Sequence, residues 1–338
     1  MSTLGIVAIG RNEGERFKKC VESFSKVTQA FTFVYVDSGS TDGSVQVAKE
    51  AGVGVVELDT TVPFTAARAR NAGVDYLSKH YPNLTYIQFV DGDCQIAPNW
   101  LTSAIEVLEK EQDVAVVCGR RKEINPQSST YNALIDLEWN TPIGYNKACG
   151  GDALYRASAF LKEDGFNGTV IAGEEPELCY RLRQRAWKIK RIDADMTYHD
   201  AALTTFSQWW KRAERYGHAA FEGAYRYGKQ AERYYVKEAK GIVLWGALVP
   251  FTFIASLFLF WPLAILTCVL LLLQWFKLKR FYSGANTPTE LINQRAWLTL
   301  VCKIAEFKGG LRFLKNKILK RQNKLIEYKG SAVGEARK

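Results

Sequence analysis

Two acidic residues, Asp91 and Asp93, flank Gly92 directly after the apolar run Tyr86–Val90. Such a run is typical of a buried strand, so both carboxylates are expected at its carboxyl end. Close carboxylates repel each other and lose hydration unless a cation or hydrogen-bond donors neutralise them, and an oxygen-rich site suits Mg²⁺ or Mn²⁺. The pattern predicts a divalent cation that bridges diphosphate oxygens. A plain Asp-Gly turn is the alternative.

A second polar segment, Val36–Ser44, leaves one strand-like run and opens a helix-like one. Its glycines and small hydroxyl side chains let a ligand approach the backbone closely. Taken alone, it is an ordinary loop in which Thr or Asp caps the next helix. Together with the acidic pair, it becomes a candidate ligand-binding loop.

The elements that must position these residues alternate between two hydrophobic periods. Strands are predicted at residues 4–9, 31–36, 53–58, 86–90 and 114–118, and helices at residues 13–24, 44–51, 65–79 and 99–111. This alternation predicts an α/β domain with a mainly parallel sheet flanked by helices. Ligands of such sheets bind beyond the carboxyl ends of the strands, where both polar segments are expected.

Ordered motifs within residues 1–230 resemble those of the family 2 inverting glycosyltransferases, which have the GT-A fold. The matching segments are Val7–Glu13, Val36–Asp42, Arg70–Gly73, Asp91–Asp93 and Ala172–Leu178. The second is similar to the family's valine-aspartate-aspartate-glycine-serine-threonine-aspartate loop, with Ser38 in place of the second aspartate. The third and fourth look like its arginine-asparagine-x-glycine and aspartate-x-aspartate motifs. The resemblance implies a Rossmann-like GT-A domain that uses a nucleotide-sugar donor.

The resemblance also implies which residues hold that donor. Asn12 and Glu13 belong to the segment that looks like the first nucleotide-binding loop. Asp37 would accept a hydrogen bond from the base, and Asp91 would hold the ribose. Arg70 would add positive charge near the base or the phosphates. These roles position the donor and balance its charge.

Metal binding is implied for Asp93 and His199. Asp93 would bind the Mg²⁺ or Mn²⁺ that neutralises the leaving diphosphate. His199, in the segment Thr197–Asp200, follows the expected last strand of the domain, where related enzymes can place a third metal ligand. A single histidine is also often a hydrogen-bonded structural residue, so both roles stay open.

The catalytic base is sought in Ala172–Leu178, which resembles the family's glutamate-aspartate-x-x-leucine motif. Glu175 is the expected base, and Glu174 is its rival because Glu stands where the family has Asp. Pro176 is expected in the first helical turn, which would put Glu175 at the cap, facing the cleft. The alternative is that the acids of this segment, Glu177 included, only complement the helix dipole.

An apolar stretch between Lys240 and Lys277 carries no charged residue, and Trp261-Pro262 interrupts it. Basic residues flank both ends, so a membrane hairpin that returns both ends to the cytoplasm agrees with the positive-inside tendency. Each arm has about 17 residues, against roughly 20 needed to cross. Two full spans and a re-entrant hairpin therefore both stay open.

Residues 303–329 carry apolar side chains at helical spacing, interleaved with lysine and arginine. This pattern predicts a basic amphipathic helix on an anionic membrane surface, with a possible break at Gly309-Gly310. A solvated helix packed on the globular domain is the alternative. We thus expect a GT-A domain at 1–235, a membrane-embedded helical hairpin at 236–282 and a basic amphipathic C-terminal segment at 283–338.

Composition agrees with a globular chain: 47% of the 338 residues are hydrophobic and 24% are charged, which excludes disordered and collagen-like proteins. The net charge of +10 favours an anionic partner. No recognised nucleic-acid module accompanies this charge, so we expect a membrane surface and a phosphorylated ligand rather than nucleic acid.

The predicted activity is metal-dependent, inverting transfer of a sugar from a nucleotide diphosphate to an acceptor at the cytoplasmic face of the inner membrane. A UDP-sugar donor is favoured over a GDP-sugar, and a lipid-linked saccharide is the expected acceptor, in glycan or exopolysaccharide assembly. The glutamine-x-x-arginine-tryptophan motif of processive synthases has no match at Gln184–Trp187 or Gln208–Arg212, so one sugar per acceptor is expected. A sugar-nucleotide nucleotidyltransferase and a non-catalytic membrane scaffold are the alternatives. The oligomeric state stays open.

Overall fold

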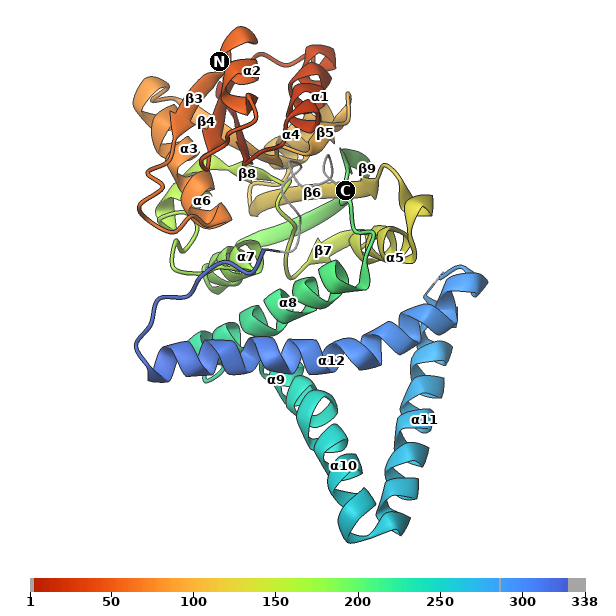
Figure 1. Ribbon diagram of the computed structural model, residues 1–338. Coiled ribbons are helices and arrows are strands. Elements are labelled where there is room, and N and C mark those ends of the chain that lie inside the picture. Colours follow the sequence, from red (N-terminus) through yellow and green to blue (C-terminus); the bar gives the residue numbers. More distant parts are fainter. Residues whose placement is uncertain (1–2, 286, 328–338) are drawn as a thin grey trace. The chain divides into compact units, whose positions relative to one another are not determined.

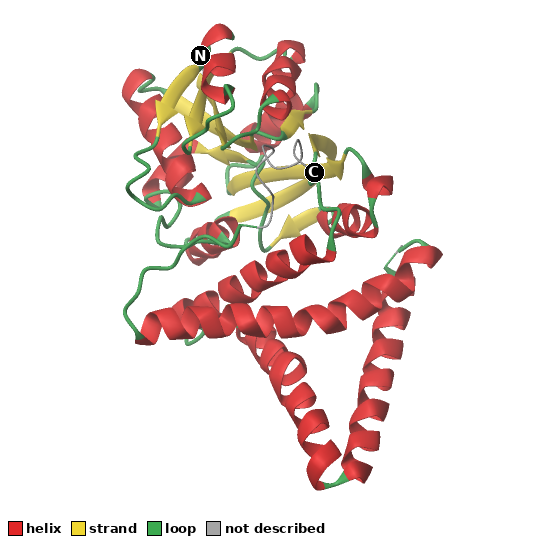
Figure 2. Cartoon of the chain, in the orientation of Figure 1, coloured by secondary structure: helices red, strands yellow, loops and turns green. Residues whose placement is uncertain are grey.

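A computed structural model of the chain describes residues 3–285 and 287–327 (Figure 1). These residues form two compact units, one made of 3–126 and 138–202 and the other of 127–137 and 203–327 apart from residue 286. All strands of the described residues lie in the first unit, and the second is helical (Figure 2). The functional division at residues 235 and 282 stays a prediction, and the predicted segment 283–338 extends past the described residues.

The first unit is built on one nine-stranded sheet in the order β3-β2-β1-β4-β8-β6-β9-β5, with β7 also paired to β9. The strands are β1 (Thr3–Gly10), β2 (Phe31–Asp37), β3 (Gly54–Glu57), β4 (Leu84–Asp91), β5 (Cys94–Ile96), β6 (Val114–Glu123), β7 (Gly144–Asn146), β8 (Leu154–Arg156) and β9 (Lys188–His199). The core is a contiguous set of buried aliphatic and aromatic side chains from both the strands and the flanking helices.

The sheet is mixed, which corrects the expectation of a mainly parallel one. Strands β1 to β4 pair in parallel, as do β6 and β9. However, β8 runs antiparallel between β4 and β6, and both β5 and β7 run antiparallel to β9. Each of these three antiparallel strands has only three residues, too few for a hydrophobic period to show in the sequence.

The helices of the first unit flank this sheet, with α3 packed on β1 and β2 and α4 packed on β6 and β9. The α-helices are α1 (Glu15–Ser23), α2 (Ser44–Glu50), α3 (Ala66–His80), α4 (Trp100–Lys110), α6 (Ala157–Lys162) and α7 (Glu174–Gln184). A 3₁₀ turn follows α1 at Phe24–Lys26, another occupies Pro126–Ser128, and α5 spans Thr130–Trp139. The strands and helices predicted up to residue 118 are confirmed, with ends that shift by at most two residues except for β6, which continues to Glu123.

Strand direction brings the polar segments together. β1, β2, β4, β6 and β9 all point the same way, because the antiparallel β8 separates two strands of equal direction. They end at Gly10, Asp37, Asp91, Glu123 and His199. The acidic pair and the polar loop therefore lie at the carboxyl edge, as predicted.

The second unit contains α8 (Phe206–Tyr227), α9 (Val236–Val243), a π-helical turn (η3, Leu244–Leu248), α10 (Val249–Leu259), α11 (Trp261–Gly284) and α12 (Thr289–Ile318). The continuous helix Val236–Leu259 and helix α11 each have 24 residues and are apolar and long enough to cross a membrane. The π-helical turn lies directly before Pro250, which has no N–H for the regular helical ladder.

The last helix corrects two predictions. α12 begins at Thr289 rather than Lys303, ends at Ile318, and passes through Gly309-Gly310 without a break. The physical reason is a close crossing with α8: a Cβ on Gly309 would lie 1.9 Å from the carbonyl oxygen of Glu214. Glycine here removes a side chain so that two backbones can meet, and it does not end the helix.

We therefore expect Gly309→Ala to lower the free energy of unfolding by about 2–3 kcal/mol, because the added methyl group forces the two helix backbones apart. The measurement is thermal or denaturant unfolding in detergent, followed by circular dichroism. Gly241→Ala is the matched control, since an added Cβ there meets nothing within 4 Å and the change should be neutral or slightly stabilising. If the two variants had the same free energy of unfolding, the close crossing of α8 and α12 would be contradicted.

Candidate active site

A buried arginine joins three carboxylates at the carboxyl edge of the sheet. The Arg70 guanidinium, 3% exposed on α3, donates through Nη1 to Glu174 Oε1 at 3.0 Å and to Glu175 Oε1 at 2.9 Å. Its Nη2 donates to Asp91 Oδ1 at 2.9 Å. One cation thus links α3, the end of β4 and the start of α7. The sequence placed Arg70 near a base or phosphate, and the structure places it against acidic side chains.

A second arginine, Arg121 on β6, completes this network. Its Nη2 donates to Asp91 Oδ2 at 2.7 Å, and its Nε donates to Asp152 Oδ2 at 2.7 Å. Asp152 is fully buried and also accepts from the Thr197 hydroxyl and the Asp91 N–H. Burial opposes ionisation of Asp91, but Arg70 and Arg121 outweigh it and hold the pKa of Asp91 at about 2. Asp91 is therefore an anion at neutral pH.

The two candidate bases lie in the first turn of α7. The helix is capped by Gly173 and begins at Glu174, so Pro176 is its third residue and Glu175 is not the cap, contrary to the prediction. Burial and the neighbouring Glu174 raise the pKa of Glu175 to about 7, although Arg70 acts in the opposite direction. The Glu175 side chain is 14% exposed and that of Glu174 is 3% exposed, so Glu175 is the more accessible of the two.

The loop before β8 lies directly against this pair. A Cβ on Gly151 would meet Arg70 Nη2 at 2.4 Å and Glu175 Oε1 at 3.0 Å. Glycine at this position lets the backbone pass over the ion pair. The segment Cys149–Asp152 is therefore next to the candidate base.

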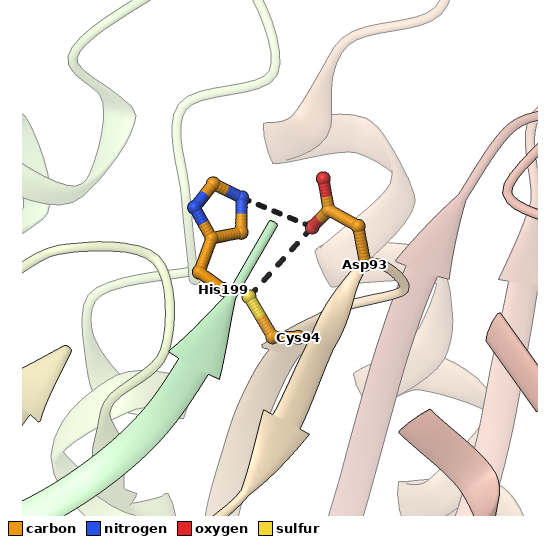
Figure 3. Close-up of side chains that lie close together, drawn as sticks. All are labelled: Asp93, Cys94 and His199. Carbon is orange, nitrogen blue, oxygen red and sulfur yellow. Dashed lines mark hydrogen bonds and ion pairs between the residues drawn. The ribbon is translucent and has the colours of Figure 1, made fainter. Parts of the chain in front are cut away.

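The candidate metal ligands also meet, as Figure 3 shows. Asp93 precedes β5 and His199 ends β9, and His199 Nε2 lies 3.2 Å from Asp93 Oδ1. Cys94 Sγ lies 3.7 Å from the same oxygen. These three residues can offer ligand atoms within 4.8 Å of one another. The Trp139 ring packs on the His199 ring, with centroids 4.7 Å apart.

The donor set fits a divalent cation, because Asp93 can supply oxygen and His199 can supply nitrogen. Burial and Asp152 raise the pKa of the Cys94 thiol, so its sulfur is a neutral and weak ligand. In a second cluster, Asp91, Cys94 and Asp152, both carboxylates already pair with Arg121, and Asp91 also pairs with Arg70.

The predicted nucleotide loop is held by internal hydrogen bonds. The buried Asp37 accepts from the N–H groups of Gly39 and Ser40 through Oδ2 and from the Tyr35 hydroxyl through Oδ1. Asn12 accepts from the Thr41 N–H, and its own N–H donates to the Ser40 hydroxyl. These bonds join the ends of β1 and β2 into one preformed loop pair.

Of the predicted site residues, Arg70, Asp91, Glu174 and Glu175 meet in one network, and Asp93 meets His199. Asn12 and Asp37 meet in the loop pair, whereas Glu13 forms a 2.8 Å ion pair with Arg16. Sequence analysis missed Arg121. The sequence does contain a pattern that indicates Arg121. It lies in a basic run, Arg120–Lys122, near the end of a strand that reaches the same sheet edge as the acidic pair.

Comparison with known proteins supports a glycosyltransferase domain. Residues 6–160 match the family described as Glycosyl transferase family 2. A protein of Escherichia coli (strain K12) described as the uncharacterized glycosyltransferase YibD is 32% identical over 110 residues. That match covers 31% of this chain and spans only 30% of the relative's length.

Solved structures share the fold at low sequence identity. The mannosyltransferase PcManGT of Pyrobaculum calidifontis, in complex with GDP-Man and Mn²⁺, has a TM-score of 0.63 and 14% identity, covering 93% of this chain and 87% of that one. Residues 1–349 of TarS from S. aureus, in complex with UDP-GlcNAc, have a TM-score of 0.50 and 14% identity, covering 95% and 93%. This likeness supports a GT-A-like α/β fold.

The raised pKa of Glu175 predicts a stability cost at neutral pH. The fold favours the protonated acid, so stability falls as pH rises from the ordinary value of 4.5 toward about 7. Glu175→Gln keeps an oxygen for Arg70 and removes the buried charge. We expect the free energy of unfolding of this variant to exceed that of the wild type by about 1–3 kcal/mol at pH 8. At pH 4 the two proteins should have the same free energy of unfolding.

The measurement is denaturant unfolding of both proteins at the two pH values. Glu57→Gln is the control, because that side chain is 65% exposed and its change should be neutral at both. A Glu175→Gln variant that is destabilised at pH 8 would show that Glu175 is buried as a stabilising anion.

Proposed function

We propose that this chain, through its glycosyltransferase family 2 domain, transfers a sugar from a nucleotide-diphosphate donor to an acceptor hydroxyl with inversion at the sugar carbon. The observation that carries the proposal is the Glu175 carboxylate. It is largely shielded from solvent, at 14% exposed, and its pKa is near 7. It shares Arg70 with Asp91 and lies next to the Gly151 loop. A base with this pKa is half ionised at neutral pH, which is the condition for efficient general-base catalysis.

Donor binding is assigned to the preformed loop pair and to the end of β4. The Asp37 carboxylate has lone pairs left for the base after its three internal bonds, and Asp91 is ionised and aligned by two arginines. Two proteins of the same fold are bound to nucleotide sugars, one to GDP-Man and one to UDP-GlcNAc. We propose a UDP-sugar as the donor and a GDP-sugar as the next choice.

Asp93 and His199 would hold a divalent cation, which when bound would neutralise charge that develops on the leaving diphosphate. Both residues are nearly fully buried, Asp93 directly before β5 and His199 at the end of β9, so we expect their positions to be fixed before the donor arrives. Arg70 and Arg121 each pair with Asp91, two residues before Asp93. The acceptor oxygen bonds to the sugar carbon as the bond to the diphosphate breaks, and Glu175 takes the hydroxyl proton.

The acceptor and the location are proposed from the second unit. Two 24-residue helices have long apolar stretches, and their basic residues lie at the ends away from the hairpin tip. These are Lys237 and Lys240 near the start of the first helix and Lys277, Lys279 and Arg280 near the end of the second. This arrangement supports attachment to the cytoplasmic face of the inner membrane, where a lipid-linked saccharide would share the surface with the enzyme. Anchoring both reactants to one surface raises their effective concentration.

The first experiment is calorimetric titration of the detergent-purified full chain with UDP and GDP, with and without Mn²⁺. We expect one nucleotide to bind in a metal-dependent way, and we expect Asp93→Asn to remove that dependence. Asp113→Asn is the control, since its carboxylate is 53% exposed and pairs only with Lys188 on the surface. Nucleotide binding that is equal in all three proteins would refute the metal assignment.

The second experiment tests the base. We expect kcat/KM for sugar transfer to rise with pH to a midpoint near 7, because Glu175 must lose its proton before it can accept another. Glu175→Gln should lower the rate by roughly 10²–10⁴-fold while nucleotide binding persists.

Glu174→Gln separates the two candidate bases. Glu174 raises the pKa of Glu175, so removing its charge should shift the midpoint to lower pH. If Glu174→Gln instead abolished transfer and Glu175→Gln kept the pH profile, Glu174 would be the base.

A further inference from the structure

The tip of the apolar hairpin has no polar side chain. Helices α10 and α11 meet at Phe258–Leu263, and every residue of this segment is apolar. Phe258 and Leu259 are each 84% exposed, and Phe260 and Trp261 are exposed by 63% and 66%. A turn that emerges into water on the far side of a bilayer would leave this patch in contact with solvent, which is unfavourable. The tip is therefore more stable in an apolar environment than in water.

Only part of the first 24-residue helix projects beyond its crossing with α12. It is fixed to α12 at Gly246, where an added Cβ would lie 2.1 Å from the Lys303 carbonyl oxygen. Lys303 forms a 2.6 Å ion pair with Glu306 at this level, and such a pair belongs in the polar region of a bilayer. Thirteen residues, 247–259, project beyond the crossing, or about 20 Å of helix. The hydrocarbon core is about 30 Å thick.

The second arm gives a similar length. From Trp261 to Phe276 there are sixteen residues, or about 24 Å of helix, before Lys277 begins a basic cluster. Lys279 Nζ lies 4.5 Å from the Trp275 ring centre, an aromatic and basic pair typical of a membrane interface. Figure 1 shows α10 and α11 meeting at the tip and diverging toward α12, so their tilt shortens the reach further.

We propose that the hairpin is a re-entrant wedge that enters the membrane from one face and ends in the acyl region without reaching the opposite surface. The exposed apolar side chains of the wedge contact the hydrocarbon interior of the bilayer. The lysines and arginines at the other ends of its two helices contact anionic headgroups. This inference rests on the proposed membrane attachment and goes beyond it, because it fixes how deep the chain enters. The few polar side chains in the arms agree with this: Ser256 and Thr267 donate to carbonyl groups of their own helices.

The test uses the full chain reconstituted in vesicles of phosphatidylethanolamine and phosphatidylglycerol. Leu259→Cys reports the tip, and Ser283→Cys reports the aqueous flank, since Ser283 is exposed at the end of α11. A membrane-impermeant maleimide is supplied outside the vesicles or trapped inside them. The label bound by the wild-type chain is subtracted from that bound by each variant, so that labelling of the native cysteines is removed. We expect Ser283→Cys to react from one side, and Leu259→Cys to react from neither side until the vesicles are dissolved.

Depth is measured independently by Trp261 fluorescence in vesicles whose acyl chains carry bromine at defined carbons, with Trp261→Phe as the blank. We expect the strongest quenching from deep bromines. A third variant, Leu259→Lys, should lower the membrane-bound fraction by about 100-fold, whereas Ser283→Lys should leave it within about 2-fold.

Labelling of Leu259→Cys from the side opposite to Ser283→Cys, or Trp261 quenching by bromines near the far surface, would establish two full spans and overturn the proposal. Labelling of both variants from one side would show that the hairpin does not insert, and the membrane attachment would fall with it. The transferase assignment is judged separately, by nucleotide binding and by Glu175→Gln, so the two failures are distinguishable.

Discussion

The site depends on one buried cation. The Arg70 guanidinium is 3% exposed and forms ion pairs with three carboxylates that come from β4 and α7. A buried charge is tolerated only when it is paired and hydrogen-bonded, so the position of α3 fixes where these acids must stand. Asn71, the next residue, donates to the Phe166 carbonyl and accepts from its N–H, which holds the loop ahead of α7. Two adjacent side chains thus attach the candidate base to the sheet.

The unequal ionisation of the acids follows from the same interaction. Asp91 accepts hydrogen bonds from both Arg70 and Arg121, so its pKa falls. Glu175 is largely buried and shares Arg70 with Glu174, so its pKa rises. Carboxylates within one network therefore become suited to different tasks, a fixed anion and a proton acceptor. Asp152 supports this division from a fully buried position, because it orients Arg121.

The sequence predicted the first half of the fold well, because residues up to 118 alternate long, periodic segments and the acidic motifs fall at strand ends. It could not predict β5 and β7, which have three residues each, nor the antiparallel placement of β8 that interrupts the sheet. Gly309-Gly310 suggested a break because glycine disfavours helix in isolation, and tertiary packing against α8 overrides that preference. Arg121 was missed for a related reason: its role depends on β8, which brings Asp152 beside β6.

The hairpin widens from the exposed tip at Phe258–Trp261 toward the level of α12. In the proposed re-entrant arrangement, such a shape would take up more area near the headgroups of one membrane face than deep in the bilayer. The lipids of that face would then have to spread, which would cost less where the membrane already bulges toward the protein. The geometry of two short helices would thereby give this chain a preference for convex regions of the membrane, without any lipid-specific contact.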